Sequence, residues 1–336
     1  MNYYIKIYSN KPKEDINNIV ETIGYKSVGP DIKKTGGLAH FLIKSLVLLS
    51  ILWRVRRGDM LLIQYPYKKF FKLSCQLAHM KGGKVVTLIH DLGSFRRKKL
   101  TVEGENKLLM HSDYLICHNA SMHKFLVEHG YTNPIDDLEI FDYLSSVEPA
   151  DYQTPHKPWQ LVYAGGLGYK RNPFLYALDD KIEGWKLELF GKEFEEERSK
   201  GWKNIHFNGL LTPEELARRA EGDFGLVWDG ESMDECSGAW GEYLKINNPH
   251  KTSFTLRIGL PVVIWKRAAM APFIEQNKVG ICVDSLLDLN NVLANLTPET
   301  YAQMRSNAKQ MSRRLAEGYY TRQALLKAEK TLGVGE

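Results

Sequence analysis

Short apolar runs alternate with longer amphipathic stretches along most of the chain. In the first half, the apolar runs are bounded by glycine, proline or polar residues, which is typical of buried strands. The predicted strands of this half cover residues 3–8, 60–64, 85–90 and 114–118. Apolar residues at helical spacing predict helices between them, at residues 13–23, 70–81 and 121–129. Strands separated by helices indicate a parallel sheet with right-handed crossovers.

The pattern changes at residues 148–158, where three prolines occur among polar neighbours. Such a segment is typical of a linker between domains. The alternation then restarts, and the predicted strands cover residues 160–164, 186–190, 205–208, 224–228, 261–265 and 280–283. The sequence therefore predicts an α/β fold with two Rossmann-like domains, residues 1–150 and 158–315, followed by a helix at residues 316–336.

The most apolar stretch of the chain covers residues 38–55, and three cationic residues stand at its end, Arg54, Arg56 and Arg57. Because it contains Lys44 and Arg54, we expect it to be too short and too interrupted to span a bilayer. Two interpretations stay open. The stretch is either a core helix or a helix that lies on an anionic membrane surface.

Basic charge is concentrated in the first third of the chain. Residues 1–100 contain 19 Lys or Arg and 6 Asp or Glu, whereas the remainder contains 26 and 34. Such a one-sided field attracts anionic partners, which are nucleic acid, an anionic membrane or a phosphorylated substrate. The cationic residues in question include Lys33, Lys34, Lys68, Lys69 and residues 96–99. The tandem α/β pattern does not require nucleic acid, and we expect no nucleic-acid partner.

Cysteines and acidic residues give no sign of a metal site. The four cysteines lie far apart without a CxxC pair, which is typical of reduced, mostly buried thiols. No D-x-D motif occurs, and residues 229–231 come nearest to one. Residues 1–9 lack the pattern of a signal peptide. We therefore expect a cytoplasmic protein with no cofactor and no metal, in peripheral contact with the inner face of the cell membrane if residues 38–55 lie on it.

Residues that follow strands are the first candidates for a binding site, since ligands of open α/β sheets bind beyond the carboxyl ends of the strands. One such loop contains Gly165, Gly166 and Gly168 and then Lys170 and Arg171. The glycines allow backbone N–H groups to approach an anion, and the two cations add positive charge. The alternative interpretation is a tight turn with two solvated cations.

A second candidate is residues 247–253, which lead into a helix. Lys251 falls in the first turn of this helix, where the helix dipole alone would favour an acidic residue. A lysine there is explained if it meets an anionic ligand that sits on the helix end. The alternative is an ordinary connection from loop to helix to strand.

A family resemblance rests on these residues. Pro249-x-Lys251 followed by Gly259-x-Pro261-Val262 resembles the nucleotide-sugar half of GT-B glycosyltransferases. The longer runs, residues 247–251 and 259–265, resemble bacterial β-1,6-galactofuranosyltransferases, which are similar to the glucosyltransferases that extend glycans on streptococcal adhesins. The runs at 64–66, 88–92 and 117–119 match the same group.

The resemblance implies a GT-B fold, with two Rossmann-like domains facing across a cleft and a last helix, residues 316–336, that returns to the N-terminal domain. It also implies transfer of a hexose, galactofuranose or glucose, from a UDP-sugar to a saccharide acceptor. The transfer would be inverting and metal-independent, and would serve surface polysaccharide or glycoprotein glycan synthesis. A nucleotide-sugar epimerase and a non-catalytic partner subunit remain as alternatives. The sequence leaves open whether the acceptor is lipid-linked and whether the chain forms a homo-oligomer.

The resemblance also assigns the donor site residue by residue. Lys251 would contact the diphosphate, with Lys170 or Arg171 beside it. The loop at residues 210–212 would hold the base, and Phe254 stands where many such enzymes place a glutamate for the ribose. The full set of expected nucleotide-sugar ligands is Gly166, Lys170, Arg171, Leu211, Thr212, Trp228, Asp229, Asn248, His250, Lys251, Thr252 and Ser253.

The N-terminal half would bind the acceptor. Asp91 is the expected general base and His90 is its rival, because one group must take the proton from the acceptor hydroxyl. The alternative is structural, with Asp91 capping a helix and His90 as an inner residue. Gly36 and Gly37 precede the apolar stretch and would admit a phosphate or a sugar to the helix end, or else form an ordinary loop.

Overall fold

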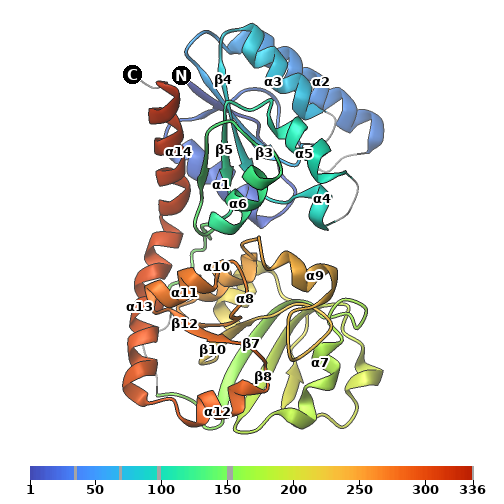
Figure 1. The fold of residues 1–336 in the computed structure, drawn as a ribbon, viewed down its shortest axis with the longest axis vertical. Helices are drawn as coiled ribbons and strands as arrows, with labels where there is room; N and C mark the ends of the chain where they lie inside the picture. The colour runs from blue at the N-terminus through green and yellow to red at the C-terminus, as the bar shows by residue number, and fades with distance from the viewer. Residues whose placement is uncertain (34–35, 68–69, 97–99, 150–153, 335–336) are drawn as a thin grey trace. The chain divides into compact units, whose positions relative to one another are not determined.

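The computed structural model describes residues 1–33, 36–67, 70–96, 100–149 and 154–334. The chain divides into two compact units (Figure 1). Unit 1 comprises Met1–Asp142 and Glu317–Glu336, and unit 2 comprises Tyr143–Ala316. The division therefore falls before the proline-rich segment that we expected to be the linker. The last residues of the chain belong to the same unit as the first ones.

Unit 1 is built on a parallel sheet with the strand order β2-β1-β3-β4-β5-β6. The central strands β3 and β4 are almost wholly buried, because they are apolar on both faces and helices cover both faces of a parallel sheet. The strands are β1 (Asn2–Tyr4), β2 (Lys26–Ser27), β3 (Met60–Tyr65), β4 (Lys84–Ile89), β5 (Tyr114–Cys117) and β6 (Ile135–Asp137).

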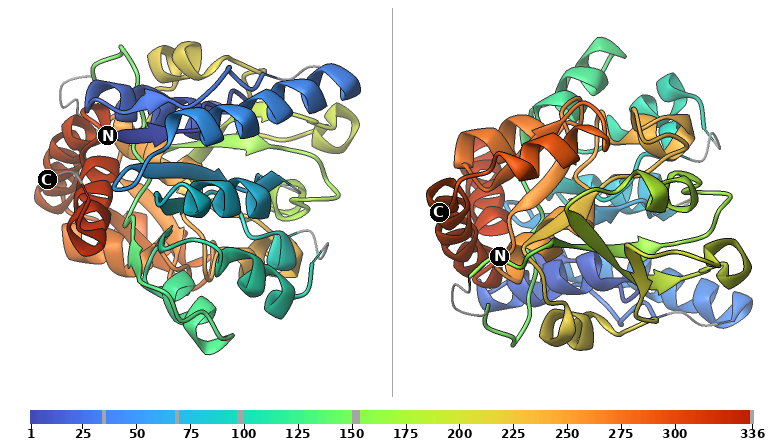
Figure 2. Two further views of the ribbon diagram at one scale, coloured as in Figure 1. Left: turned by 90° about the horizontal axis from the view of Figure 1, so that it is seen from above. Right: turned by 90° about the horizontal axis from the view of Figure 1, so that it is seen from below.

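Helices of unit 1 pack on the two faces of this sheet. α3 contacts β3 and β4 and runs beside α2, whereas α14 contacts α1 and β5 (Figures 1 and 2). The helices are α1 (Lys11–Thr22), α2 (Gly37–Arg54), α3 (Phe70–Met80), α4 (Gly93–Arg96), α5 (Val102–Leu109), α6 (Ala120–Glu128) and α14 (Tyr319–Leu332). The turn before α14 needs a glycine, because Gly318 has a φ of 70° and a Cβ atom there would lie 2.7 Å from Ile19.

Unit 2 repeats the plan with the strand order β12-β11-β10-β7-β8-β9. Its strands, again all parallel, are β7 (Trp159–Gly166), β8 (Trp185–Lys192), β9 (Ile205–Phe207), β10 (Phe224–Val227), β11 (Val262–Trp265) and β12 (Gly280–Val283). The α-helices are α7 (Phe174–Ala177), α8 (Pro213–Arg219), α9 (Gly238–Tyr243), α10 (His250–Arg257), α11 (Ala271–Asn277), α12 (Asp288–Ala294) and α13 (Pro298–Ala316). Two short 3₁₀ helices, η1 (Asp179–Lys181) and η2 (Glu196–Ser199), follow β7 and β8.

Each sheet has one point where the chain reverses its direction of strand addition. In unit 1 this point lies between β1 and β3, and in unit 2 it lies between β7 and β10. Ligands of doubly wound sheets bind at such points, beyond the carboxyl ends of the strands. Along its length α10 packs closely on β10, because Gly225 has no side chain and an added Cβ would lie 2.3 Å from Thr255.

The apolar helix α2 does not lie in the core of unit 1. Only Lys44, Val47 and Ile51 are buried along it, so the core-helix interpretation is wrong for its outward side. Of the described helices, α2 is the one long and apolar enough to cross a membrane by length and composition, with a mean hydropathy of 1.4. That finding also corrects the expectation that the stretch is too short.

Gly36 and Gly37 are exposed at the start of α2. A Cβ atom at either position would meet nothing within 4 Å, so packing does not demand glycine there. Residues 34 and 35 lie outside the described residues, as do residues 68–69 and 97–99, on which part of the expected basic surface falls.

Candidate donor and acceptor sites

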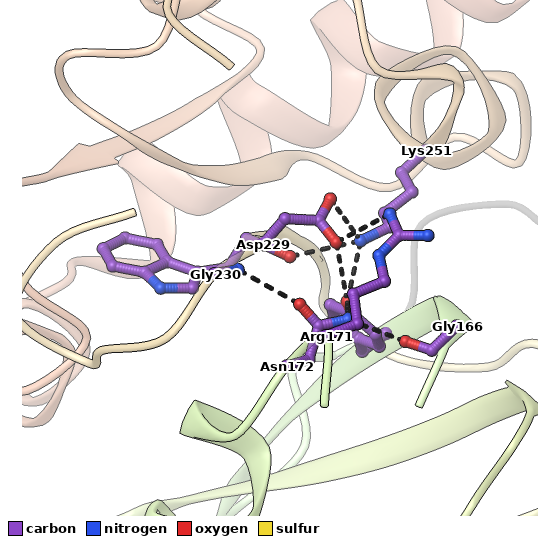
Figure 3. Close-up of polar contacts among 8 residues, drawn as sticks. Gly166, Arg171, Asn172, Asp229, Gly230 and Lys251 are labelled. Atoms are coloured by element: carbon purple, nitrogen blue, oxygen red, sulfur yellow. Dashed lines mark hydrogen bonds and ion pairs between the residues drawn. The ribbon is translucent and has the colours of Figure 1, made fainter. Parts of the chain in front are cut away.

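A buried polar cluster lies at the carboxyl ends of β7 and β10 in unit 2, and Lys251 is at its centre (Figure 3). The Nζ atom of Lys251 lies 2.9 Å from Asp229 Oδ2, 3.1 Å from the carbonyl oxygen of Trp228 and 2.7 Å from the hydroxyl of Tyr163. Lys251 comes from the first turn of α10, and Asp229 comes from the loop after β10. The cluster therefore occupies the reversal point of the sheet.

Arg171 is the second cation of this cluster. Its Nη2 atom lies 3.0 Å from Asp229 Oδ1, and its guanidinium stacks 4.0 Å from the centre of the Trp240 ring. Two cations thus share one carboxylate, and the side chains of Asp229, Lys251 and Arg171 are 6%, 13% and 29% exposed. Burying an excess of one sign of charge is unfavourable unless a further counter-charge is present. The cluster is therefore suited to a ligand with negative charge.

The same contacts determine which groups of the cluster carry a charge. Burial would raise the pKa of Asp229, but the charges of Lys251 and Arg171 outweigh it and hold this pKa below its usual value. Burial lowers the pKa of Lys251, and the charge of Asp229 opposes the loss of its proton. Burial raises the pKa of Tyr163 well above its ordinary value, so this residue stays a neutral phenol. Asp229 is therefore the ionised acceptor of the cluster.

Backbone geometry lets the cations reach Asp229. A Cβ atom on Gly165 would lie 2.9 Å from Cε of Lys251, so the absence of a side chain at Gly165 leaves room for the aliphatic part of the lysine.

Asn172 connects the loop after β7 to the loop after β10 through two hydrogen bonds (Figure 3). Its Nδ2 donates to the carbonyl oxygen of Gly166 at 2.8 Å, and its Oδ1 accepts from the backbone N–H of Gly230 at 3.1 Å.

Two buried hydroxyls follow Lys251 in the first turn of α10. Thr252 and Ser253 are almost fully buried, and neither hydroxyl has a hydrogen-bond partner among the residues that the structure describes. No side chain caps this helix at Pro249. A buried polar atom without a partner costs about 1–3 kcal/mol. A ligand that hydrogen-bonds these groups would recover that free energy.

Three other residues that were expected to bind the nucleotide-sugar, Lys170, Trp228 and Thr212, make different contacts. Lys170 is exposed, and none of the described residues forms an ion pair with it. The Trp228 ring is buried and donates its Nε1–H to the carbonyl oxygen of Ser232, and the carbonyl oxygen of Trp228 accepts from Lys251. Thr212 caps α8 in a capping box with Glu215.

Three further candidates are Leu211, His250 and Asn248. Leu211 packs against a hydrophobic group that includes Tyr143. The His250 ring lies 5.0 Å from the ring of Tyr143, and Asn248 is buried. Sequence reasoning missed Tyr163, Asn172 and Trp240, since a tyrosine within a predicted strand looks like an ordinary core residue.

A second polar group lies at the carboxyl ends of β3 and β4 in unit 1. His90 follows β4, and its Nε2 lies 2.7 Å from Oε1 of Gln64 at the end of β3. The His90 ring also stacks on Phe141 with 5.3 Å between ring centres. Asp91 follows and is half-buried. In α4, which follows, the N–H groups of Gly93 and Ser94 donate to Glu105.

Lys13 belongs to this group and was not predicted. It lies in the first turn of α1, and its Nζ donates to the carbonyl oxygens of Gln64 and Pro66 at 3.2 and 3.3 Å. Burial lowers its pKa to about 8, and the charge of Lys44 adds to this effect while that of Asp91 opposes it. A buried lysine near Asp91 places a titratable cation close to the expected base.

One group of possible metal ligands occurs within the described residues. Cys117, His123 and Asp137 place their ligand atoms within 4.8 Å of one another. Burial raises the pKa of Cys117 well above its ordinary value, and its thiol donates to Asp137 at 3.2 Å. His123 Nδ1 also lies 3.1 Å from the same Asp137 carboxylate, so the three side chains form one hydrogen-bonded cluster.

The two doubly wound units define an α/β fold of the GT-B glycosyltransferase kind. A solved lipopolysaccharide outer core galactosyltransferase, WaaB, has this fold, with a TM-score of 0.59 at 10% identity over 98% of this chain and 100% of the other. This likeness confirms the predicted fold.

The sequence comparisons are more specific. Residues 5–140 match the N-terminal domain and residues 161–328 the C-terminal domain of the glucosyltransferase 3-like family, and the chain belongs to this family. It is 34% identical to the β-1,6-galactofuranosyltransferase WbbI of Escherichia coli (strain K12), over 86% of this chain and 85% of the other. It is 28% identical to glucosyltransferase 3 of Streptococcus gordonii, over 83% and 81%. The resemblance inferred from the motifs is confirmed, and the protein is a glycosyltransferase.

Proposed function

We propose that the protein transfers a hexose from a UDP-sugar to a hydroxyl of a saccharide, with inversion at the anomeric carbon. Galactofuranose is the first choice of sugar and glucose the second, in line with the two relatives. The observation that carries the proposal is the buried cluster in which Lys251 and Arg171 share Asp229 beside two hydroxyls without partners. Its charge and its donors suit a nucleoside diphosphate.

The proposed role of the donor cluster is to stabilise the leaving group. As the bond to the sugar breaks, negative charge grows on the β-phosphate of UDP. Cations and hydrogen-bond donors that are already oriented stabilise such charge strongly, because they need no rearrangement during the reaction. Lys251, Arg171 and the first turn of α10 supply these groups from unit 2, and we propose that they act without a metal ion.

The proposed acceptor site is the polar group of unit 1. Asp91 would take the proton of the acceptor hydroxyl, and His90, which is held by Gln64 and Phe141, would orient the acceptor. Inversion is a single displacement, so one base is sufficient. We propose a lipid-linked saccharide as the acceptor, for the synthesis of a surface polysaccharide or of a glycoprotein glycan.

Titration of the protein with UDP in excess EDTA tests the donor site. We expect calorimetry to give the same Kd with and without the chelator, because protein cations replace a metal in the proposed site. Binding that vanishes with EDTA would contradict the metal-free part of the proposal. Release of UDP from a panel of UDP-sugars, each with and without simple acceptors, then identifies the sugar.

A pH profile tests the acceptor site through Lys13. The pKa of Lys13 is about 8, so its charge is present below this pH and is lost above it. We expect kcat/KM for the acceptor to fall as the pH rises through about 8, if the cation assists the group around Asp91. Replacement of Lys13 with Met should lower kcat/KM at pH 7 about tenfold, the scale of one hydrogen bond to a charged group, and should remove this alkaline limb.

Lys26→Met is the matched control for that profile, since Lys26 is exposed on β2. The control variant should keep the kcat/KM of the unchanged enzyme at pH 7 and should also keep the fall in kcat/KM above pH 8. Thermal unfolding of both variants checks that the fold is intact. If a folded Lys13→Met enzyme shows the same fall in kcat/KM above pH 8, Lys13 has no role in the acceptor site.

A further inference from the structure

The outward side of α2 is apolar along its whole length. Its side chains are 46–83% exposed and recur at spacings of three and four residues, so they form one stripe along the helix. We call this stripe the outer face, and it consists of Leu38, Phe41, Leu42, Leu46, Leu49 and Trp53. Leu73 and Met80 of the neighbouring helix α3 are also exposed.

The opposite side of α2 is already packed into unit 1. Val47 and Ile51 are fully buried, and Nζ of Lys44 lies 4.9 and 5.3 Å from the ring centres of Tyr67 and Phe70. The helix is therefore apolar on both sides. A helix at the surface of a soluble protein normally turns a polar face outward. A contiguous exposed apolar face instead marks an interaction surface.

Cationic residues surround the outer face. Lys33 precedes α2, Arg54 ends it, and Arg56 and Arg57 follow it, and all four are exposed. Lys72 and Lys81, in and just after α3, are exposed as well. Apolar side chains bordered by cations complement one surface in particular, the headgroup region of a membrane that contains anionic lipid.

We propose that the outer face of α2 inserts into the headgroup region of an anionic bilayer, with α2 parallel to the membrane and the cations against lipid phosphates. α2 does not span the bilayer in this arrangement, because Val47 and Ile51 stay in the core of unit 1. A second copy is a poorer occupant, since a two-fold contact sets the same cationic borders against each other. The proposal goes beyond the transfer reaction, because it gives the protein an anionic lipid surface as a partner.

Vesicle flotation of the full chain tests this proposal. The vesicles contain phosphatidylcholine alone, or phosphatidylcholine and phosphatidylglycerol in equal amounts. We expect binding to the mixed vesicles that weakens as salt is added, because salt screens the contribution of the cations. Leu42→Gln/Leu46→Gln/Leu49→Gln should reduce the partition coefficient by at least about tenfold, and these side chains are already exposed, so the fold should persist.

Two further variants separate charge from apolar contact. Arg56→Gln/Arg57→Gln should weaken binding to the mixed vesicles by about tenfold or more, since each cation near an anionic surface contributes about 1 kcal/mol. Leu326→Gln is the matched control, because Leu326 is exposed on α14, away from α2. That control should float like the unchanged protein.

Fluorescence reports the depth of insertion. Trp53 is 83% exposed, and the other six tryptophans lie between residues 159 and 265, in unit 2. Mixed vesicles with brominated lipid should quench part of the emission, and Trp53→Phe should abolish that quenching. Quenching that persists in Trp53→Phe would show that another surface meets the lipid.

The outcomes decide between membrane and self-association. Absence of flotation at low ionic strength, or flotation that the triple leucine variant leaves unchanged, would overturn the proposal. A protein that does not float and whose mass by light scattering falls in the triple variant uses the outer face to bind a second copy. UDP affinity should be the same in all these variants, so failure here is distinct from failure of the proposed donor site.

Discussion

Replacement of Asp91 with Asn is expected to lower the rate of sugar transfer by about 10²–10⁴, the usual contribution of a general base. Asn keeps the shape of the side chain and cannot accept the proton of the acceptor hydroxyl. The affinity for UDP should hardly change, because the residues of the donor cluster belong to unit 2 and Asp91 belongs to unit 1. Turnover measured by UDP release, with UDP affinity by calorimetry, gives both quantities.

His90→Gln is the companion variant for this experiment. Glutamine keeps a hydrogen-bonding group near Gln64 but has no basic nitrogen. If Asp91 is the base, this variant should retain much more activity than Asp91→Asn. An active Asp91→Asn enzyme beside an inactive His90→Gln enzyme would transfer the role to His90. An α-linked product in the NMR spectrum would contradict inversion altogether, because the sugar of the donor is α-linked.

Loss of Lys251 is expected to have the second large effect. Lys251→Met should weaken UDP binding by about 1.5–3 kcal/mol, the contribution of a hydrogen bond to a charged group, which is about a 10- to 150-fold rise in Kd. The physical reason is that Lys251 supplies one of two cations in a buried cluster. Lys170→Met is the control, since Lys170 is exposed and outside the cluster.

Stability must be measured beside affinity in this case. Lys251→Met leaves Asp229 buried with Arg171 as its remaining cationic partner in the cluster, so the free energy of unfolding should fall. A rise in Kd of less than about threefold in a folded Lys251→Met protein, under ~0.7 kcal/mol, would exclude Lys251 as a diphosphate ligand.

Part of the nucleotide-sugar site can be predicted from the sequence. Loops that follow strands meet at one edge of a parallel sheet, and this rule alone predicts that Gly166, Asp229 and Lys251 lie at one site. It could not choose between Lys170 and Arg171, because adjacent residues point in different directions and only the folded loop turns Arg171 onto Asp229. The role of Tyr163 could not be predicted from the sequence, because a tyrosine within a buried strand normally packs in the hydrophobic core.

Unit 1 was harder to predict. β2 and β6 have two and three residues, too few for a recognisable apolar run. The predicted strand at residues 3–8 is shorter as β1, although Ile7 still bridges to Ile32. Lys13 was missed because a lysine in a first turn normally points to water, and its burial depends on Gln64, far away in the sequence. An apolar stretch such as α2 also gives no indication of which side faces the core.

The excess of positive charge in the donor cluster has a consequence for turnover. UDP released by the reaction carries one more negative charge than the diphosphate of the intact sugar nucleotide. The groups that stabilise the leaving diphosphate, Lys251 and Arg171, therefore also hold the product. Accumulating UDP should compete with the donor, and steady synthesis requires that UDP be removed as it forms. An assay in which UDP is hydrolysed as it forms should therefore give a higher steady rate of transfer than an assay in which UDP accumulates.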